Sequence, residues 1–506
     1  MSTFRMESGG RVDRTRPLRF SFDGETFMGL HGDTLASALL ANGVHLVGRS
    51  FKYHRPRGIL TAGAEEPNAL VTVRRDAARC TPNLRATQVE LYESLCAESQ
   101  NRWPSLRLDF GRISDLLSPL FPSGFYYKTF MWPRGAWKAL YEPLIRKSAG
   151  LGRAPTLPDP DRYAGLYAHC DVLVVGAGPA GLAAALAASE GGARVILCDE
   201  QAEAGGSLLG STSEQIDGIA AELWLQRTLA TLNGNPRLRL LPRTTAFGYF
   251  LHNSIALNER LSDHLENPDS KLARERLWQV RAREVVLATG AIEQPLVFPG
   301  NDRPGIMLAG AARTYLNRYG VRAGSRAVVV TATDSAYQAA LDLQAAGVEI
   351  AGIADLRGSA SGASPEAARR AGIRIMTGAV VLSTRGNLRV SAIELETAAD
   401  DGRTRRSQSF ACDLVVMSGG FTPSVHLFSQ SRGRLAWSES AQAFLPSVSA
   451  ERERSAGACR GLNSLAEVLN DGAAAGAAAA EAAGHRGVVH RFAVNAPDSG
   501  TQTPSG

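Results

Sequence analysis

The stretch Asp171–Gly181, DVLVVGAGPAG, decides the fold of the largest part of this chain. A run of aliphatic residues leads directly into Gly176, Gly178 and Gly181, and an alanine-rich segment follows. Glycines at this spacing permit a tight turn, close approach of the backbone to a pyrophosphate, and close packing of a helix on a strand. The pyrophosphate then lies on the exposed N–H groups of the helix N-terminus. The stretch therefore predicts a βα unit that binds a dinucleotide.

A second strand with an acidic end supports this interpretation. Arg194–Glu200 reads RVILCDE, and Asp199 follows Gly181 at about the distance expected for the carboxylate that accepts hydrogen bonds from the ribose hydroxyls. The same negative charge disfavours a 2′-phosphate, so we expect NAD rather than NADP. Glu200 is the alternative ribose ligand.

Composition sets wider limits. The chain has 506 residues, 44% of them hydrophobic, and a formal net charge of +6, which predicts two to four globular domains. No apolar run is long enough to span a membrane, and the first residues are polar and contain arginine. The six cysteines are far apart and show no metal-binding or redox spacing. We expect a cytoplasmic protein with no metal site and no membrane or nucleic-acid partner.

Changes in composition divide the chain into regions. We predict a flexible N-terminus (1–16), a small domain (17–95), an aromatic and basic connector (96–165), an α/β body (166–485) and a disordered tail (486–506). In the small domain, Asp33 is the predicted N-cap of a helix. The basic residues between Arg49 and Arg57 are interpreted as a loop packed on the body or on another subunit, because aromatic residues are not arranged for base stacking.

The order of motifs in the body resembles that of flavoproteins with two dinucleotide-binding units, the glutathione reductase type. Glu284–Ala291, EVVLATGA, resembles the ATG motif of this class and brings Thr289 and Gly290 to the first site. A second βαβ unit, at about 320–410, has Thr331, Ala332 and Thr333 where glycines are expected. Because a Cβ at each position obstructs a phosphate, we predict that this second unit is degenerate.

The end of the body bears on the choice between NAD and FAD. In flavin-binding members of the class the last core strand usually ends in Gly-Asp, whereas here it reads Ser455–Ala458, SAGA. The small residues of 464–484 predict a helix packed closely on the first nucleotide-binding helix. We expect NAD, with FAD on this chain the less favoured alternative.

The small domain resembles a plant-type ferredoxin in outline. Its loop from Arg49 to Thr61 contains no cysteine, so it has no thiolates to bind a [2Fe–2S] cluster. The predicted fold is therefore α/β: a Rossmann-type, glutathione reductase-like body with two dinucleotide-binding units, and an N-terminal ferredoxin-like β-grasp domain without cluster cysteines.

These regions together resemble the alpha subunit of heterotetrameric sarcosine oxidase over about residues 17 to 485. The resemblance rests on this combination and on three phrases: SFKYHRPRGI from Ser50, GFYYKTFMWP from Gly124 and SGGFTPSVHLFSQSRGRL from Ser418. The family's alpha subunit continues into a half that resembles the folate-binding aminomethyltransferase, and this chain stops before it. We therefore expect no direct folate binding by this chain.

The resemblance implies a tightly held, non-reacting NAD. The matching positions are Gly176, Gly178, Ala180 and Gly181 at the pyrophosphate, Asp199 and Glu200 at the ribose, Ser207 after a double glycine, and Ala246 near the adenine. It also implies a beta-type subunit whose FAD accepts the hydride, FMN at the alpha–beta interface, small gamma- and delta-type subunits, and no catalytic residue on this chain. The alternatives are a related complex that oxidises an opine, hydroxyproline or glycine (cyanide-forming), and a non-catalytic nucleotide-binding scaffold.

Overall fold

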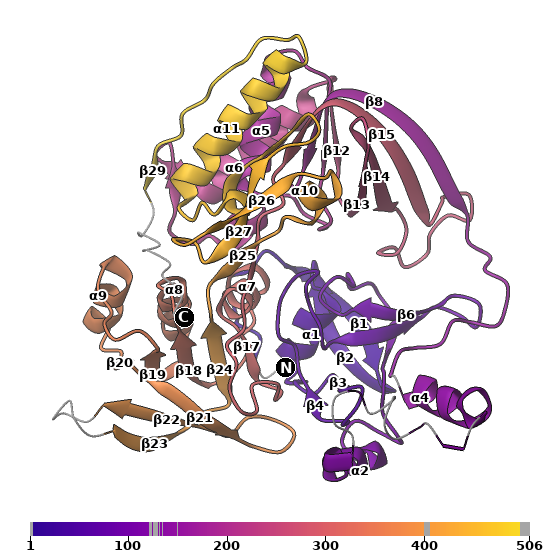
Figure 1. The fold of residues 1–506 in the computed structure, drawn as a ribbon, viewed down its shortest axis with the longest axis vertical. Helices are drawn as coiled ribbons and strands as arrows, with labels where there is room; N and C mark the ends of the chain where they lie inside the picture. The colour runs from indigo at the N-terminus through magenta and orange to yellow at the C-terminus, as the bar shows by residue number, and fades with distance from the viewer. Residues whose placement is uncertain are drawn as a thin grey trace.

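The computed structural model describes residues 4–120, 124, 130, 132–133, 135–148, 150–398 and 405–495. Figure 1 shows an N-terminal β domain beside two α/β units that lie one above the other, with the first nucleotide-binding unit at the top of the view. Aliphatic strands form the centre of both α/β units, and their buried side chains make separate hydrophobic cores. The predicted fold class is confirmed.

The N-terminal domain is built around a five-stranded sheet of order β2-β1-β7-β5-β6. Its β1 and β7 are parallel and the other pairs are antiparallel, which is the arrangement of a β-grasp sheet. The elements are β1 (Asp13–Phe22), β2 (Glu25–His31), α1 (Leu35–Ala41), β5 (Leu70–Arg74), β6 (Cys80–Arg85), β7 (Leu95–Ser99) and the short hairpin β3 (Gly48–Arg49) and β4 (Pro56–Arg57).

Two predictions for this domain are wrong. Thr34, not Asp33, is the N-cap of α1, because its hydroxyl accepts the N–H of Ser37. Asp33 instead forms a buried ion pair with Arg5. The prediction of a flexible N-terminus is also wrong for residues 4–16, since Phe4 packs edge-to-face on His45 and β1 begins at Asp13. Residues 1–3 lie outside the described residues.

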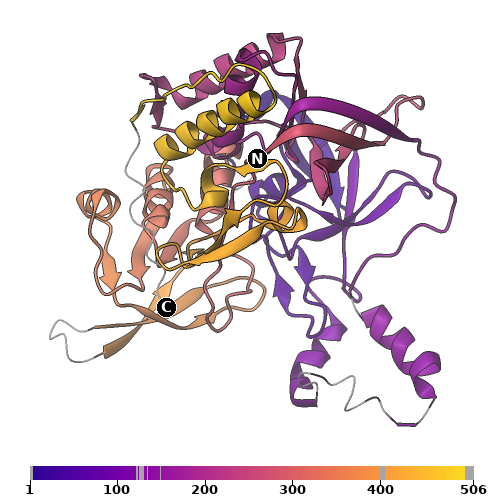
Figure 2. The same cartoon turned by 45° about the horizontal axis from the view of Figure 1, so that its top comes forward.

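The connector leaves the N-terminal domain as short helical segments. They are η1 (Phe110–Arg112), α2 (Ile113–Leu116), η2 (Ser118–Leu120), η3 (Trp137–Tyr141) and α4 (Glu142–Ser148). In both Figure 1 and Figure 2, α2 and α4 project from the edge of the molecule, away from the α/β units. Most of the segment 121–134 lies outside the described residues.

The first nucleotide-binding unit contains a sheet of order β12-β9-β8-β15-β14-β13, with β28 on β15. Its strands are β8 (Tyr163–Val175), β9 (Val195–Cys198), β12 (Leu238–Leu241), β13 (Thr244–Phe250), β14 (Ser254–Arg260), β15 (Glu275–Leu287) and β28 (Glu453–Ser455). Its helices are η4 (Gly206–Gly210), α5 (Pro179–Glu190), α6 (Ala221–Gly234), η5 (Gly457–Arg460) and α11 (Leu465–Ala482). Smaller elements complete it: β10 (Gln215–Ile216), β11 (Ile219–Ala220), α10 (His426–Gln430), β26 (Arg434–Ser438) and β27 (Ala443–Val448).

The second unit is a parallel sheet of order β17-β24-β18-β19-β20 with an antiparallel extension, β21-β22-β23. Its elements are β17 (Ile306–Leu308), α7 (Ala309–Tyr319), β18 (Arg326–Thr331), α8 (Ser335–Ala345), β19 (Glu349–Asp355), α9 (Ala363–Arg370), β20 (Ile375–Thr377), β21 (Val380–Arg385), β22 (Ala392–Ala398), β23 (Arg405–Ala411) and β24 (Leu414–Ser418). The antiparallel pair β16 (Ala291–Glu293) and β25 (Phe421–Pro423) links the two units.

The predicted disordered tail is wrong for residues 486–495. Strand β29 (Val494–Asn495) pairs with β10, and the buried Phe492 packs edge-to-face on Trp224. Residues 496–506 lie outside the described residues. Over the described part of the chain, no helix combines the length and apolar character needed to cross a bilayer.

Candidate nucleotide-binding site

The glycine turn lies between β8 and α5, at the carboxyl end of the central strands. Gly176 has φ +98°, and a Cβ there would lie 2.3 Å from the carbonyl oxygen of Ala288 on the neighbouring strand. A Cβ on Gly181 would lie 1.7 Å from the carbonyl oxygen of Gly176. These two positions therefore exclude every side chain, the first by conformation and contact and the second by helix–strand packing.

The middle glycine leaves room for a ligand. Gly178 is the N-cap of α5, and the nearest atom to a Cβ built on it is the Cα of Gly206, 3.9 Å away. Pro179 follows at the first helical position, and the N–H groups of Ala180 and Gly181 begin the helix without an intrahelical acceptor. Such N–H groups and the helix dipole favour an anion, so this open position is a cradle of the size and charge that suit a pyrophosphate.

Asp199 fastens the glycine turn to the second strand. Its Oδ2 accepts the N–H of Ala177 at 2.6 Å and its Oδ1 accepts the N–H of Gln201 at 2.8 Å. Burial raises the pKa of this carboxyl, while the two backbone donors act in the opposite direction. Asp199 thus stabilises the turn itself, in addition to any contact with a ribose.

Glu200 faces a cleft instead. Its carboxylate accepts no hydrogen bond from any residue within the described part of the chain, and it lines a cleft of about 420 Å³ between the first nucleotide-binding unit and the N-terminal domain. Burial and the neighbouring Asp199 raise the pKa of Glu200. Of the two predicted ribose ligands, Glu200 has the carboxylate with unused acceptor capacity toward open space.

The remaining predicted ligands surround this turn. Ala246 is half-buried on β13, and β13 begins beside the acid because the N–H of Thr244 donates to the carbonyl of Asp199 at 2.7 Å. Ser207 is exposed in η4, next to Gly206. A Cβ on Gly206 would lie 2.8 Å from the Cα of Gly178, so the double glycine allows η4 to approach the turn.

Thr289 and Gly290 follow β15 at the same edge of the sheet. The Thr289 hydroxyl donates to the carbonyl of Ser424 at 2.6 Å, and the N–H of Ser424 donates to the carbonyl of Gly290 at 2.9 Å. Gly290 has φ +72°, with no atom within 4 Å of a Cβ built on it. Thr289 therefore connects the end of β15 to the residue that follows β25, while Gly290 leaves open space beside the glycine turn.

In the second unit the corresponding turn is filled by its own side chains. Thr331 and Thr333 are fully buried; the Thr331 hydroxyl donates to the carbonyl of Thr333 at 2.7 Å and accepts its N–H at 2.9 Å. Asp355, at the end of β19, is buried and bound by Arg357 and the hydroxyl of Tyr337. The N–H group and the acid that could bind a second nucleotide are already paired within the protein.

One acidic residue near the last core strand was missed by the sequence argument. Asp471, on α11, accepts the N–H of Gly457 at 2.8 Å and also pairs with Arg460. It is hydrogen-bonded to the SAGA stretch but comes 14 residues after Gly457, so no local sequence pattern predicts this contact. Because its carboxylate already has two donors, it serves this protein as an anchor for the η5 turn.

The N-terminal domain contributes to the cleft, which the sequence argument also missed. Gly63, Ala64 and Thr87 of that domain line the same cleft as Glu200. Glu90 of the same domain forms a bidentate ion pair with Arg243, at 2.6 and 2.7 Å. Arg243 directly precedes β13, so this pair holds the N-terminal domain over the cleft.

The arrangement can bind a dinucleotide, but the described residues provide no redox pair beside it. All six cysteines are free, and burial raises the pKa of Cys170 to about 12. Cys198, which precedes Asp199, is fully buried and its thiol pKa is also raised by burial. Buried thiols of this kind are protonated and unreactive at neutral pH.

Comparison with known proteins gives the same organisation. Residues 15–102 match the 2Fe-2S iron-sulfur cluster binding domain, and residues 170–443 match the pyridine nucleotide-disulphide oxidoreductases. The chain is 51% identical over 474 residues to the sarcosine oxidase alpha subunit of Rhizobium meliloti (strain 1021), covering 94% of this chain and 47% of that protein. It is 43% identical to that of Corynebacterium sp. (strain P-1), covering 94% and 44%. The chain thus spans about half the length of the curated relatives it matches.

Among solved structures, L-proline dehydrogenase from P. horikoshii has the same fold, with a TM-score of 0.63 at 17% identity, covering 96% of this chain and 77% of that one. The pyridine nucleotide-disulphide oxidoreductase match spans more than half of the chain and contains the glycine turn, the acidic strand end and the second unit. The chain is a homologue of the N-terminal half of sarcosine oxidase alpha subunits and belongs to the pyridine nucleotide-disulphide oxidoreductase family.

Proposed function

We propose that this chain is the NAD-carrying, alpha-type subunit of a multi-subunit sarcosine oxidase-like complex. The complex would convert sarcosine, O₂ and water into glycine, formaldehyde and H₂O₂. Hydride transfer would take place on the FAD of a beta-type subunit, with FMN at the interface and small gamma- and delta-type subunits completing the assembly. The observation that carries this proposal is one open nucleotide turn and one filled turn in a chain 51% identical to an alpha subunit.

The proposed NAD ligands all belong to the first unit. The N–H groups of Ala180 and Gly181, beside the open Gly178, would bind the pyrophosphate. Glu200, with Asp199 behind it, would accept hydrogen bonds from the ribose, and Ala246 would lie near the adenine. Ser207 and Gly290 border the same turn.

NAD is favoured over FAD for a structural reason. Flavin-binding members of the class usually end the last core strand in an acid, whereas the SAGA stretch here has none, and the nearby Asp471 is already bound to the N–H of Gly457 and to Arg460. NAD held in this way would be oriented by backbone N–H groups and carboxylates. The bound NAD would therefore support the assembly, and the redox chemistry would belong to the flavins.

The identity of the released nucleotide tests the proposal. The chain is purified, denatured, and the supernatant is separated by chromatography with absorbance and fluorescence detection. We expect close to one NAD per chain and no flavin. FAD released from this chain alone would contradict the assignment.

Activity provides the second test. The isolated chain should produce no peroxide with sarcosine, and the complex formed with its FAD-carrying subunit should produce it. Profiling the complex with glycine, hydroxyproline and an opine distinguishes the related amine oxidations. Robust sarcosine turnover by the isolated chain would refute the proposed division of labour.

A further inference from the structure

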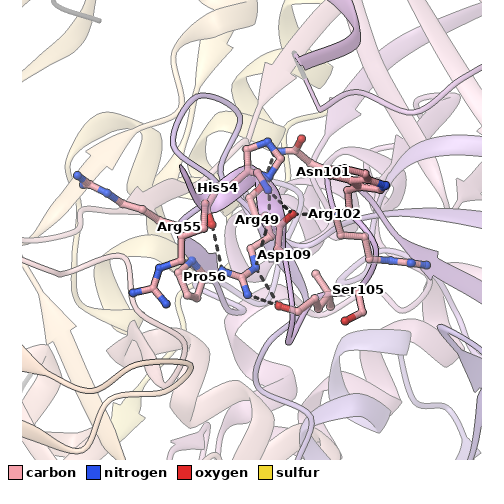
Figure 3. A network of polar contacts seen from close by, with 12 residues as sticks. Arg49, His54, Arg55, Pro56, Asn101, Arg102, Ser105 and Asp109 are labelled. Atoms are coloured by element: carbon pink, nitrogen blue, oxygen red, sulfur yellow. Dashed lines mark hydrogen bonds and ion pairs between the residues drawn. The ribbon is translucent and has the colours of Figure 1, made fainter. Parts of the chain in front are cut away.

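The loop that replaces an iron–sulfur site is held by a buried charged network. Arg49, at the base of the β3–β4 hairpin, has its side chain 1% exposed, and Asp109 of the connector is fully buried. Figure 3 shows these side chains pointing toward one another, with His54 completing the group. The guanidinium Nε lies 3.8 Å from Asp109 Oδ2, and His54 Nδ1 lies 2.7 Å from the same oxygen.

The network fixes the backbone of the connector. Asp109 Oδ1 accepts the N–H groups of Trp103 at 3.0 Å and Gly111 at 3.1 Å, and Arg49 donates to the carbonyl of Leu106 at 2.9 Å. Burying such charges contributes little net stability, but it can specify one conformation. The segment 103–111 is therefore held in a defined shape on the N-terminal domain.

What this anchored segment presents to the outside is apolar. Trp103, Leu108, Phe110, Ile113 and Leu116, here named the connector shelf, are between 56% and 81% exposed. The rings of Trp103 and Phe110 stack edge-to-face with centroids 5.4 Å apart. Five large exposed apolar side chains within 14 residues are unusual for a free surface, and rigid aromatic residues are typical of binding hot spots.

The charge around the connector shelf indicates what kind of partner fits it. Arg107 and Arg112 are exposed beside it, whereas Asp109 is buried and Asp115 is paired with Arg55. A second copy of this chain would bring the same arginines against themselves, because a two-fold interface joins identical patches. An apolar surface with an acidic rim would complement the connector shelf in shape and charge.

We propose that the connector shelf is the docking surface for the FAD-carrying subunit of the same complex, which would present an apolar face with an acidic rim. This inference rests on the proposed function, which requires such a subunit. Relatives that are named as subunits, the basic rim and the rigid anchoring by Asp109 together favour a protein partner. The ferredoxin-like domain, having no cluster cysteines in its loop, would then serve as an assembly module.

The test measures association of the full chain with the FAD-carrying subunit, by light scattering after co-expression and by titration of the separated subunits. We expect Trp103→Ser and Phe110→Ser each to raise the dissociation constant at least about tenfold, as hot-spot truncations do. Arg107→Glu should slow association, and more so at low salt than at high salt.

A matched control lies on another part of the chain. Trp437 and Phe444, on β26 and β27, form a similar exposed edge-to-face pair with centroids 5.2 Å apart. Trp437→Ser should bind the FAD-carrying subunit within about twofold of the wild type. All variants should retain the wild-type nucleotide content and circular dichroism, since the substituted side chains are exposed.

The outcomes are distinguishable. If the wild-type chain binds no FAD-carrying subunit, the proposed function fails and the docking surface fails with it. If the wild type binds and Trp103→Ser binds equally well, only the docking surface is refuted. Two other results would also overturn the proposal. If the isolated chain forms concentration-dependent dimers that Trp103→Ser abolishes, the occupant is a second copy. If it binds phosphatidylserine vesicles and Trp103→Ser abolishes that binding, the occupant is a membrane.

Discussion

At the scale of single residues, two adjacent acids have different tasks. Asp199 accepts two backbone N–H groups and so holds the glycine turn, whereas Glu200 faces the cleft with its carboxylate unused. A carboxylate offers about four acceptor positions, so Asp199 can still contribute one to a ligand. Asp199 could therefore hold the turn and accept a hydrogen bond from a ribose at the same time.

Substitution of these acids separates binding from stability. Glu200→Ala should weaken NAD binding at least about tenfold and leave the Tm near that of the wild type. Asp199→Ala should weaken binding similarly and also cost about 1–3 kcal/mol, because the N–H groups of Ala177 and Gln201 lose their acceptor. NAD content and Tm of each variant are the measurements, with the exposed Glu25→Gln as control. Full NAD occupancy in the Asp199→Ala/Glu200→Ala double variant would place the ribose elsewhere.

Glu293 is a buried carboxyl outside the nucleotide turn. Its Oε2 accepts the N–H of Gly310 at 2.7 Å, and its Oε1 has no hydrogen-bond partner among the described residues. Burial raises its pKa from 4.5 to about 7, with Ser418 and the Gly310 N–H opposing the shift and Glu65 adding to it. It lies on β16, the link between the two α/β units.

This pKa predicts a pH-dependent stability with a definite sign. Because the folded protein keeps the proton that the unfolded chain loses above its ordinary pKa of 4.5, stability falls as pH rises from 4.5 to about 7 and then levels off. The loss is on the order of 3 kcal/mol. Glu293→Gln removes this titrating group. The Tm of the wild type, measured in buffers from pH 5 to pH 8, should therefore fall relative to that of the variant as the pH rises. Parallel Tm curves for the two proteins would show that Glu293 is ionised throughout.

At the scale of elements, the first unit depends on close contact between α5 and α11. A Cβ on Gly472 would lie 2.2 Å from the carbonyl oxygen of Ala180, and one on Gly476 would lie 2.1 Å from that of Ala184. The small residues of 464–484 predicted this packing, and the structure confirms it. Since α5 also carries the N–H groups of the proposed pyrophosphate site, the position of α11 controls that site.

Gly476→Ala tests this contact because its two expected effects have opposite signs. In a free helix the change from glycine to alanine stabilises by about 1 kcal/mol. Here the added methyl group meets a backbone carbonyl that cannot move alone, so we expect a net loss of about 1–3 kcal/mol and partial loss of NAD. Ala474→Ser, exposed on the same helix, is the control for urea denaturation. Stabilisation by Gly476→Ala would show that the helices separate easily.

At the scale of the whole molecule, the N-terminal domain closes over the nucleotide-binding unit through charged contacts. Arg243 pairs with Glu90, and Arg11 pairs with Glu203 and Glu222 across the same boundary. These contacts place the loop of Gly63 and Ala64 against the cleft that Glu200 lines. A nucleotide whose ribose is bound by Glu200 would therefore lie against the N-terminal domain on one side, which would slow its release.

Glu90→Gln should therefore accelerate nucleotide release without changing the turn. Loss of a partly buried bidentate pair is worth about 1 kcal/mol, which corresponds to about a fivefold faster dissociation. The release of NAD is followed after dilution into an NAD-scavenging enzyme mixture. Glu93→Gln is the matched control, because Glu93 lines the same cleft but pairs with Arg19 inside its own domain. Equal release rates for the two variants would show that domain closure does not limit release.

The local sequence by itself determined the βα units, the open first turn, the filled second turn and the missing cluster cysteines. Each of these depends on neighbouring residues: glycine where a Cβ has no room, threonine where a phosphate would need space, and no thiol in a loop of 13 positions. These local constraints hold in any tertiary arrangement of the same segments, which is why a sequence pattern can state them.

Only the tertiary structure decided the rest. The division of labour between Asp199 and Glu200, the capture of Gly457 by Asp471 and the covering of the cleft by the N-terminal domain all depend on partners distant in the chain. Arg11 and Glu203, for example, are 192 positions apart. The same holds for Asp33. It pairs with the distant Arg5, and the neighbouring Thr34 is the N-cap instead. Hydrogen bonds and ion pairs form where packing brings donors and acceptors together, and packing of separate domains leaves no periodic signal in the sequence.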